Sequence, residues 1–406
     1  MEDLEIKLIN IIEKMRDEII EFHQKLVQIP SENPPANYKE VTKFLAKKME
    51  EIGLEVSKKR CNVIGILGKN EGKKLIFYGH HDTVEAFKGW TKDPFGGEII
   101  DGKIYGRGSS DDKSCVTAEI FAAKALKELG IELNGKLTIT AVCDEETGGY
   151  RGADYLVSNG IIEGDACLLG DGPFGVPVGY FGGGMFLTFL IKGKQSHGAG
   201  FPDVPEPYRN EHSGVNAIVR IVKIMNFLLD LKKELNEKAT KYPLPPSYPS
   251  KISDVNLAQI SGGTKISTVP DKCFLHVNIS TIPEQDIESV KQRILDFIEK
   301  MKEEDPDVEV TVQIPIAYEP QIIDENSEFA KTVKSVFNTV FNAPKDFSLF
   351  IPTTDAHWFQ EKGIETIIIG GSRMENNIHA PDEFVFIEDL MDLTKIFALT
   401  ALKYLQ

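Results

Sequence analysis

Four apolar runs in this chain each lead into a side chain that can bind a metal ion. They cover residues 75–79, 137–143, 166–170 and 366–371, and each has the length and composition of a buried strand. The side chains that follow them are His80, Glu146, Asp171 and, after a short loop, His379. Helical patterns lie between the runs, and this alternation predicts a largely parallel, two-sided α/β sheet. Because such sheets bind ligands beyond the carboxyl ends of their strands, we expect these side chains to converge on one site.

A fifth candidate ligand, Asp111, lies in a glycine-rich stretch of residues 105–113, just before a helical pattern. Glycine permits close approach of the backbone, and a carboxylate with two free oxygens can bridge two cations. The same position also suits a helix N-cap formed by Asp111 or Asp112. Taken together, two imidazoles and three carboxylates would suit a pair of divalent cations.

His80 and Asp82 stand two residues apart at a strand end, so their side chains can share one face. A ligating imidazole usually donates its other N–H to a carboxylate, which fixes its orientation. His81 would point to the opposite face and is the competing ligand. For the three residues alone, a surface turn with an incidental histidine is the alternative.

Glu145 and Glu146 are adjacent at a strand end and therefore point in different directions. One of the two can bind metal while the other stays free as a general base facing a metal-bound water. A solvated acidic pair is the alternative, but the preceding apolar run disfavours it. Asp171 by itself would suit an ordinary turn, and His197 by itself would suit a structural hydrogen bond.

Composition and charge narrow the function classes. The formal charge of −16 repels phosphate backbones and anionic membranes, so it argues against a nucleic-acid partner. No apolar run approaches the ~20 residues of a membrane span, and the acidic start carries no signal-peptide pattern. The five cysteines form no C-x-x-C pair, so we expect reduced core residues of a cytoplasmic protein.

The length of 406 residues exceeds the usual size of one hydrophobic core, so two domains are expected. After three glycines at 182–184 the pattern changes to strand-helix-strand-strand-helix-strand, the order of a split βαβ sandwich. From about residue 319 the α/β pattern returns. The sequence thus predicts an α/β domain of residues 1–183 and 319–406, interrupted by an inserted α+β domain of residues 184–318.

Read in order, six short motifs make the chain resemble the M20 family of di-zinc metallopeptidases and amidohydrolases. They are G-H-x-D-x-V at His80, G-R-G-x-x-D-x-K at Asp111, D-E-E-x-G at Glu145, G-D-G at Asp171, the segment ending in His197-Gly198, and H-x-P-x-E at His379. The resemblance covers roughly residues 31–390. Single motifs are weak, but six in the right order are strong evidence. It implies a zinc-peptidase-like catalytic domain with an inserted lid domain.

The resemblance also implies roles for individual residues. Asp111 would bridge two ions, His80 and Asp171 would complete one ion's ligands, and Glu146 and His379 the other's. It further implies a cis peptide bond between Asp111 and Asp112.

In the chemistry that the resemblance implies, Asp82 would orient His80, and Glu145 would act as general base and then general acid on a hydroxide held between the two ions. His197 of the lid would help to hold the oxyanion, in many relatives from the other subunit of a dimer. Zinc is favoured by mixed imidazole and carboxylate ligands, while cobalt or manganese could substitute.

The chain departs from the resemblance where substrate is bound. Many relatives carry a lid arginine that grips the substrate carboxylate, whereas residues 278–280 here read Asn-Ile-Ser. Ser267 stands where relatives have a lid asparagine. Arg373, between the Gly371 loop and His379, is the candidate to bind a carboxylate, and a solvent-exposed loop arginine is the alternative. Gly371 and Ser267 are the other candidate substrate-binding residues.

The leading hypothesis is therefore metal-dependent hydrolysis of the amide bond of a small N-acyl amino acid, as in the acetylornithine deacetylase and succinyl-diaminopimelate desuccinylase branch. A dipeptidase or carboxypeptidase with the same metal site is the closest alternative. A non-catalytic binding relative and a two-metal phosphohydrolase are more remote. The expected partners are a small N-acyl amino acid or dipeptide and, through the lid, a second copy of the chain.

Overall fold

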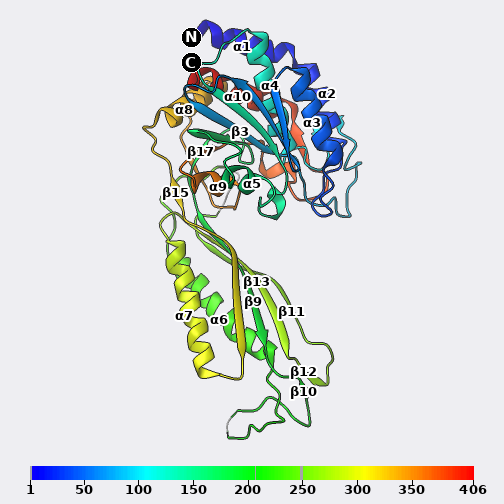
Figure 1. Cartoon of the computed structure of the whole chain (residues 1–406), viewed down its shortest axis with the longest axis vertical. Helices are drawn as coiled ribbons and strands as arrows, with labels where there is room; N and C mark the ends of the chain where they lie inside the picture. Colours follow the sequence, from blue (N-terminus) through cyan, green and yellow to red (C-terminus); the bar gives the residue numbers. More distant parts are fainter. Residues whose placement is uncertain (1, 206, 247–249) are drawn as a thin grey trace.

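The computed structural model describes residues 2–205, 207–246 and 250–406, and it has two lobes (Figure 1). Both chain ends lie on the larger lobe, on the side away from the smaller one. The smaller lobe is formed by the middle of the chain, coloured green to yellow, so it is an insertion into the larger lobe.

The larger lobe is built on a nine-stranded sheet with parallel central strands. The order is β1-β2-β6-β3-β7-β17-β8-β15, with β16 paired to β8. The strands are β1 (Glu55–Lys59), β2 (Asn62–Gly68), β3 (Lys74–His80), β6 (Lys136–Val142), β7 (Ala166–Leu169), β8 (Val178–Phe181), β15 (Gln321–Ile322), β16 (Ser348–Phe350) and β17 (Glu365–Ile368). β3 is parallel to β6 and β7, and β7 is parallel to β17. These are the four apolar runs of the sequence, and they end at one edge of the sheet as predicted.

Helices cover both faces of this sheet. One face carries α1 (Glu2–Lys14), α2 (Arg16–Val27), α3 (Lys39–Glu51), α4 (Lys113–Glu128), α8 (Glu328–Phe341) and α10 (Ile387–Tyr404), and the other carries α5 (Ala153–Ser158) and α9 (Ala356–Gln360). Along β3, Leu75 and Phe77 pack on the α4 side, whereas Ile76 and Tyr78 pack on the α5 side. Successive strand residues point to opposite faces, so a strand covered on both sides is apolar throughout.

A small antiparallel sheet joins two segments that are distant in sequence. Its order is β18-β5-β4, formed by β4 (Glu98–Ile100), β5 (Lys103–Tyr105) and β18 (Phe384–Phe386). The segment that leads to Asp111 therefore lies beside the segment that follows His379. Two 3-10 turns, η1 (Glu145–Thr147) and η2 (Met374–Asn376), also lie at this end of the lobe.

The smaller lobe has the predicted element order. Its antiparallel sheet β11-β13-β9-β14 contains β9 (Gly183–Lys192), β11 (Asp254–Gly262), β13 (Lys272–Thr281) and β14 (Glu309–Tyr318), and its helices are α6 (Ala217–Leu235) and α7 (Ile287–Glu304). Inward-facing residues of β9, such as Leu187 and Phe189, pack against these helices in a separate core. The observed strands begin and end close to the predicted limits of 184 and 318, and the domain boundaries themselves stay a prediction.

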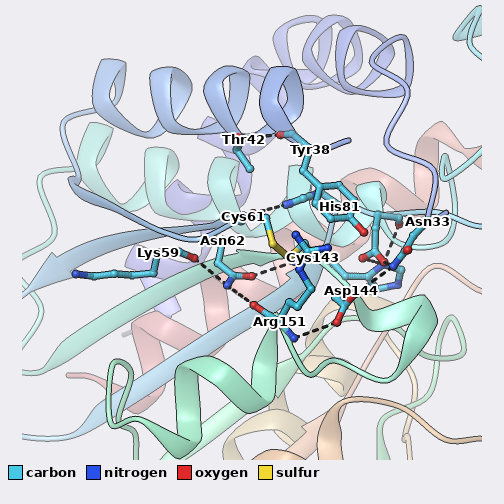
Figure 2. The surroundings of a disulfide bond; sticks show 12 residues. Asn33, Tyr38, Thr42, Lys59, Cys61, Asn62, His81, Cys143, Asp144 and Arg151 are labelled. Atoms are coloured by element: carbon cyan, nitrogen blue, oxygen red, sulfur yellow. Dashed lines mark hydrogen bonds and ion pairs between the residues drawn. A yellow bond between two sulfur atoms is a disulfide. The ribbon is translucent and has the colours of Figure 1, made fainter. Parts of the chain in front are cut away.

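The expectation of five reduced cysteines is wrong for two of them. Cys61 and Cys143 form a disulfide, with Cα atoms 5.9 Å apart, while the other three are free and buried (Figure 2). Val63 pairs with Ala141 across β2 and β6, and the same antiparallel register places residue 61 opposite residue 143. The two positions are 82 residues apart, so no local cysteine motif could reveal the pair.

Among the described residues, no helix combines the length and the apolar character needed to cross a membrane.

Candidate metal centre

The five predicted ligands and Glu145 gather at the carboxyl edge of the central sheet. They form two groups, each with ligand atoms within 4.8 Å of one another: His80, Glu145 and Asp171, and then Asp111, Glu146 and His379. His80 ends β3, Asp171 follows β7, and the two glutamates stand in η1 just after β6. The parallel strands predicted from the apolar runs therefore place these side chains together.

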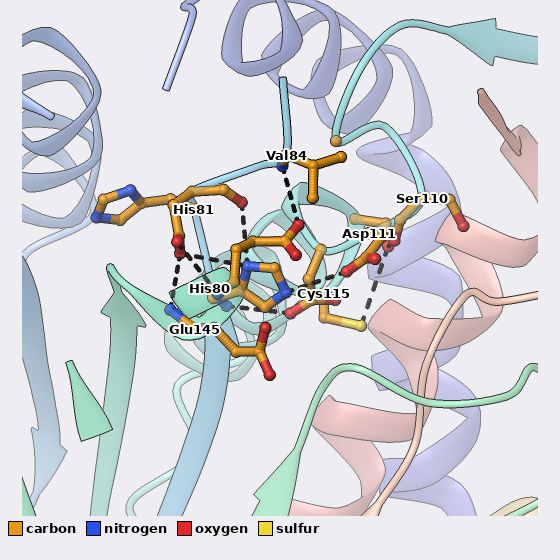
Figure 3. A network of polar contacts seen from close by, with 12 residues as sticks. His80, His81, Val84, Ser110, Asp111, Cys115 and Glu145 are labelled. Carbon is orange, nitrogen blue, oxygen red and sulfur yellow. Dashed lines mark hydrogen bonds and ion pairs between the residues drawn. The ribbon is translucent and has the colours of Figure 1, made fainter. Parts of the chain in front are cut away.

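Asp111 lies between the two imidazoles. Its Oδ1 is 3.1 Å from Nε2 of His80, and its Oδ2 is 3.1 Å from Nε2 of His379 (Figure 3 shows the His80 contact). Nε2 of His379 is also 3.2 Å from Oε2 of Glu146. One carboxylate thus reaches both groups with separate oxygens, which is the arrangement that a bridging ligand requires.

Asp82 connects His80 to η1, the turn that carries Glu145 and Glu146. Nδ1 of His80 is 3.1 Å from the main-chain oxygen of Asp82 and 3.5 Å from its carboxylate. The buried Asp82 carboxylate also accepts hydrogen bonds from the main-chain N–H groups of Glu145, at 3.3 Å, and Glu146, at 3.4 Å. It therefore fixes the His80 ring relative to η1.

The structure places the alternative candidates that the sequence left open, His81 and Asp112, in other contacts. His81 points away from the site (Figure 3), and its Nε2 contacts the main-chain oxygen of Cys61 at 2.9 Å (Figure 2). Asp112 stands at the N-cap position of α4, yet its side chain makes no capping hydrogen bond. It accepts instead from the main-chain N–H of His80, at 3.1 Å. The peptide bond between Asp111 and Asp112 is cis, as the resemblance implies.

Burial and mutual repulsion govern the protonation of the carboxylates. Burial, and next the charge of Asp171, raises the pKa of Glu145 well above its usual range. Burial, and next the charge of Asp111, does the same to the pKa of Asp171. For Asp111 burial alone would raise the pKa, but hydrogen bonds from His379 and His80 hold it below the ordinary value.

The donor set fits divalent metal ions. Four partly buried carboxylates that repel one another stand close to two imidazoles, and clustered charges of one sign are stable only when opposite charge compensates them. Imidazole nitrogen and carboxylate oxygen together are typical zinc ligands. His80 and Asp171 could hold one ion, Glu146 and His379 a second, and Asp111 both.

An open cavity of about 420 Å³ lies over these groups. The lining residues are Asp111, Glu145, Glu146, Asp171, Phe350, Pro352, Thr353, Thr354, Ser372, Arg373, Met374, Ile378 and His379. The cavity therefore has an acidic floor and a partly apolar wall, formed by the segment after β16 and by η2.

Arg373 is the single basic side chain of this lining apart from His379. Its Nε and Nη2 donate to the buried carboxylate of Asp389 at 2.6 and 2.9 Å, and its guanidinium lies 4.5 Å from the Phe174 ring. Arg373 is thus held in place rather than extended into solvent. Gly371 is not among the lining residues, and its main-chain oxygen accepts from Ser110 Oγ at 3.2 Å.

His197 and Ser267 lie elsewhere within this chain. His197 is exposed on β10 (Ser196–His197), which pairs with β12 (Thr268–Val269) at the far end of the lid (Figure 1). The main-chain oxygen of Ser267 accepts from the N–H of Gly198 at 2.9 Å, so the two candidates are neighbours. The structure does not bring either of them to the cavity within a single chain.

Sequence reasoning missed several supporting residues. Asn33 Nδ2 donates to Asp82 at 3.3 Å and to Thr147 Oγ1 at 2.9 Å, and so ties the turn at residues 33–36 to η1. Glu383 and Arg107 form a buried ion pair of 2.6 Å. Arg107 and Glu383 are letters of the quoted motifs, but their pairing depends on contacts between segments 276 residues apart.

Comparisons with known proteins agree with this geometry. The model of Peptidase family M20/M25/M40 matches residues 76–403. A probable succinyl-diaminopimelate desuccinylase of Staphylococcus aureus is 28% identical over 378 residues, covering 87% of this chain and 88% of that protein. An uncharacterized metallohydrolase of Methanocaldococcus jannaschii is 28% identical over 425 residues, covering 94% and 98%. A di-peptidase from Saccharomyces cerevisiae has the same fold, with a TM-score of 0.78, 16% identity and coverage of 100% and 99%.

The expected fold class, a catalytic α/β domain with an inserted α+β lid, is therefore confirmed, and a metal-dependent amidohydrolase or peptidase is the class of enzyme. Because the family model matches most of the length of this chain, the chain belongs to Peptidase family M20/M25/M40.

Proposed function

We propose that this enzyme hydrolyses the amide bond of a small N-acyl amino acid, in the manner of a deacetylase or desuccinylase. The observation that supports amide hydrolysis is the position of Glu145. Its carboxylate lines the cavity beside the candidate ligands, and within the described residues it forms no hydrogen bond of its own. Burial raises its pKa above the usual range, which makes the carboxylate a better proton acceptor.

Two divalent cations, with zinc favoured and cobalt or manganese as substitutes, would polarise the scissile carbonyl and acidify a water molecule. Glu145 would accept a proton from that water and deliver it to the leaving amine nitrogen. Asp82 would keep His80 and η1 in register throughout. His197 would donate a hydrogen bond to the carbonyl oxygen as negative charge develops there.

The position of His197 leads to a second part of the proposal. Because His197 lies at the lid tip, the lid of a second copy of the chain would have to deliver it, together with Ser267, to this cavity. A homodimer through the lid domain is therefore part of the proposed active form. A cytoplasmic location stays a prediction, and the Cys61–Cys143 disulfide weighs against it because such bonds are rare in reducing compartments.

Arg373 is our candidate to bind the substrate carboxylate. Asp389 engages Nε and Nη2, which leaves Nη1 of a pre-oriented guanidinium for a ligand. The Gly371 loop would support this position from behind. We expect Arg373→Met to raise KM for substrates with a free carboxylate more than for their amides.

Dipeptide hydrolysis is the second candidate, since the same base and ligands would serve it and the cavity is open. A non-catalytic role is disfavoured because Glu145 is retained together with all five ligands.

A substrate panel tests the proposal. The zinc- or cobalt-loaded protein would be assayed with N-acetyl and N-succinyl amino acids and with simple dipeptides. Turnover of the acyl amino acids is expected. Turnover of dipeptides alone would replace the first candidate by the second, and turnover of neither class by the metal-loaded protein would contradict both.

A further inference from the structure

The carboxylate of Glu383 is fully buried and receives four hydrogen bonds from one loop. Its Oε2 accepts from Nη1 of Arg107 at 2.6 Å and from the N–H of Gly108 at 3.1 Å. Its Oε1 accepts from the N–H groups of Ser110 at 3.0 Å and Asp111 at 3.1 Å. Both side chains of the ion pair are 1% exposed. Every donor therefore comes from the segment that ends in the candidate bridging ligand.

Glu383 itself belongs to the segment that carries His379. Two further contacts join the same segments: the N–H of Gly106 donates to the main-chain oxygen of Glu383 at 2.9 Å, and Arg107 Nη2 donates to that of Ala380 at 3.3 Å. Strands β5 and β18, which adjoin these two segments in the sequence, pair with each other as well. Two loops from distant parts of the chain thus behave as one unit.

The physical consequence is positional. A buried carboxylate is stable only while its partners remain in place, so the Arg107 loop and the His379 loop cannot move apart without leaving charges unpaired. These contacts fix the distance between His379 and Asp111. Nε2 of His379 lies 3.1 Å from Oδ2 of Asp111.

We infer that Glu383 is a positioning residue for the ion site formed by Asp111, Glu146 and His379. The inference rests on the proposed metal-dependent function. Glu383 holds two of the three ligands of that site, through the main chain of Asp111 and through the loop of His379. The other site shares only Asp111 and takes His80 and Asp171 from strand ends that the sheet fixes. Removing the Glu383 charge should therefore weaken the binding of one of the two ions and leave the binding of the other unchanged.

Calorimetric titration of chelator-treated protein with Zn²⁺ tests this inference. Wild-type protein should bind two ions. Glu383→Gln keeps the side-chain size but removes the charge that faces Arg107, and one of the two ions should bind about tenfold to hundredfold more weakly. Arg107→Met, which leaves Glu383 its three backbone donors, should show a smaller loss at the same ion and serves if Glu383→Gln fails to fold.

A buried ion pair in the lid provides the matched control. Asp305 accepts from Nε of Arg220 at 2.9 Å and lies within 2.8 Å of its Nη2, far from the metal centre. Asp305→Asn should lower the melting temperature and leave both zinc affinities unchanged.

Two outcomes would overturn the inference, and a third would refute the proposed function on which it rests. Glu383→Gln could behave as Asp305→Asn does, with a lower melting temperature and unchanged zinc affinities, which would make Glu383 merely structural. Equal weakening of both ions would remove the assignment to one site. Failure of the wild-type protein to bind any divalent ion would instead refute the proposed function, and is distinguished by the wild-type titration alone.

Discussion

The metal centre and the lid tip place their functional candidates in opposite surroundings. At the metal centre, Asp111 is enclosed and its two oxygens each meet an imidazole. At the lid tip, His197 is exposed, and among the described residues its Nδ1 accepts only from the N–H groups of Ala199 and Gly200 in its own loop. One chain therefore brings the candidate metal ligands and the proposed general base together by itself. The residue expected to hold the oxyanion, His197, does not reach the cavity of its own chain.

The largest effect is expected at the self-contained region. Glu145→Gln removes the proton acceptor but none of the five ligands, so turnover should fall by about 10²–10⁴-fold. Metal content, measured by atomic emission, should stay that of the wild type. Unchanged turnover would discard Glu145 as the base, and loss of metal would make it a ligand.

The lid tip should give the next largest effect. His197→Ala removes a hydrogen-bond donor to the developing oxyanion and should lower kcat by about 10²–10³-fold with little change in KM. Ser196→Ala, at the neighbouring position on β10, is the matched control and should stay near wild type.

Mixing the two variants sharpens the comparison between the regions. Glu145→Gln and His197→Ala chains refolded together should recover about a quarter of wild-type activity, because half of the dimers would contain one intact site made from both chains. No recovery in a sample that is shown to contain mixed dimers would mean that His197 does not act across an interface.

A smaller effect is expected from the disulfide behind η1. Replacing Cys61 and Cys143 together by serine should lower the free energy of unfolding by about 2–4 kcal/mol, because the bond constrains the unfolded chain. Urea unfolding of the wild type with and without dithiothreitol measures the same quantity. The double variant should not respond to reductant, and an equal response would place the effect at another cysteine.

The smallest effect is expected in the pH dependence of stability that the buried His23 produces. Burial, and next the charge of Lys113, lowers the pKa of His23 from 6.5 to about 3. The unfolded state then binds the proton more readily than the folded state. The contribution of His23 to the free energy of unfolding is therefore fully present above pH 6.5 and is lost as the pH falls toward 3. For His23 the loss from pH 7 to pH 5 should be about 2 kcal/mol.

His23→Gln isolates this contribution. The difference in unfolding free energy between wild type and variant should shrink as the pH falls from 7 to 5. A difference that is constant with pH would show that His23 titrates normally.

The sequence predicted best the features that depend on local pattern. Apolar runs such as 75–79 must be covered on both faces, which makes their strands parallel and central and brings His80, Asp171 and the η1 glutamates to one edge. The disulfide was missed because the positions of Cys61 and Cys143 follow from the register of two strands. The Arg107–Glu383 pair was missed for the same reason, since only the folded chain brings the two loops together.

The lid tip shows where sequence reasoning stops. The segment around His197 predicted a lid histidine, and the structure places it on the lid. Where it acts depends on the arrangement of two chains, and no pattern within one sequence determines that.

Anomalous diffraction at the zinc edge from crystals of the zinc-loaded protein tests the central claim most directly. Two peaks are expected, one between His80 and Asp171 and one between Glu146 and His379, with an oxygen of Asp111 bound to each. Zinc found only outside this cluster, or an Asp111 carboxylate that contacts no zinc, would contradict the account.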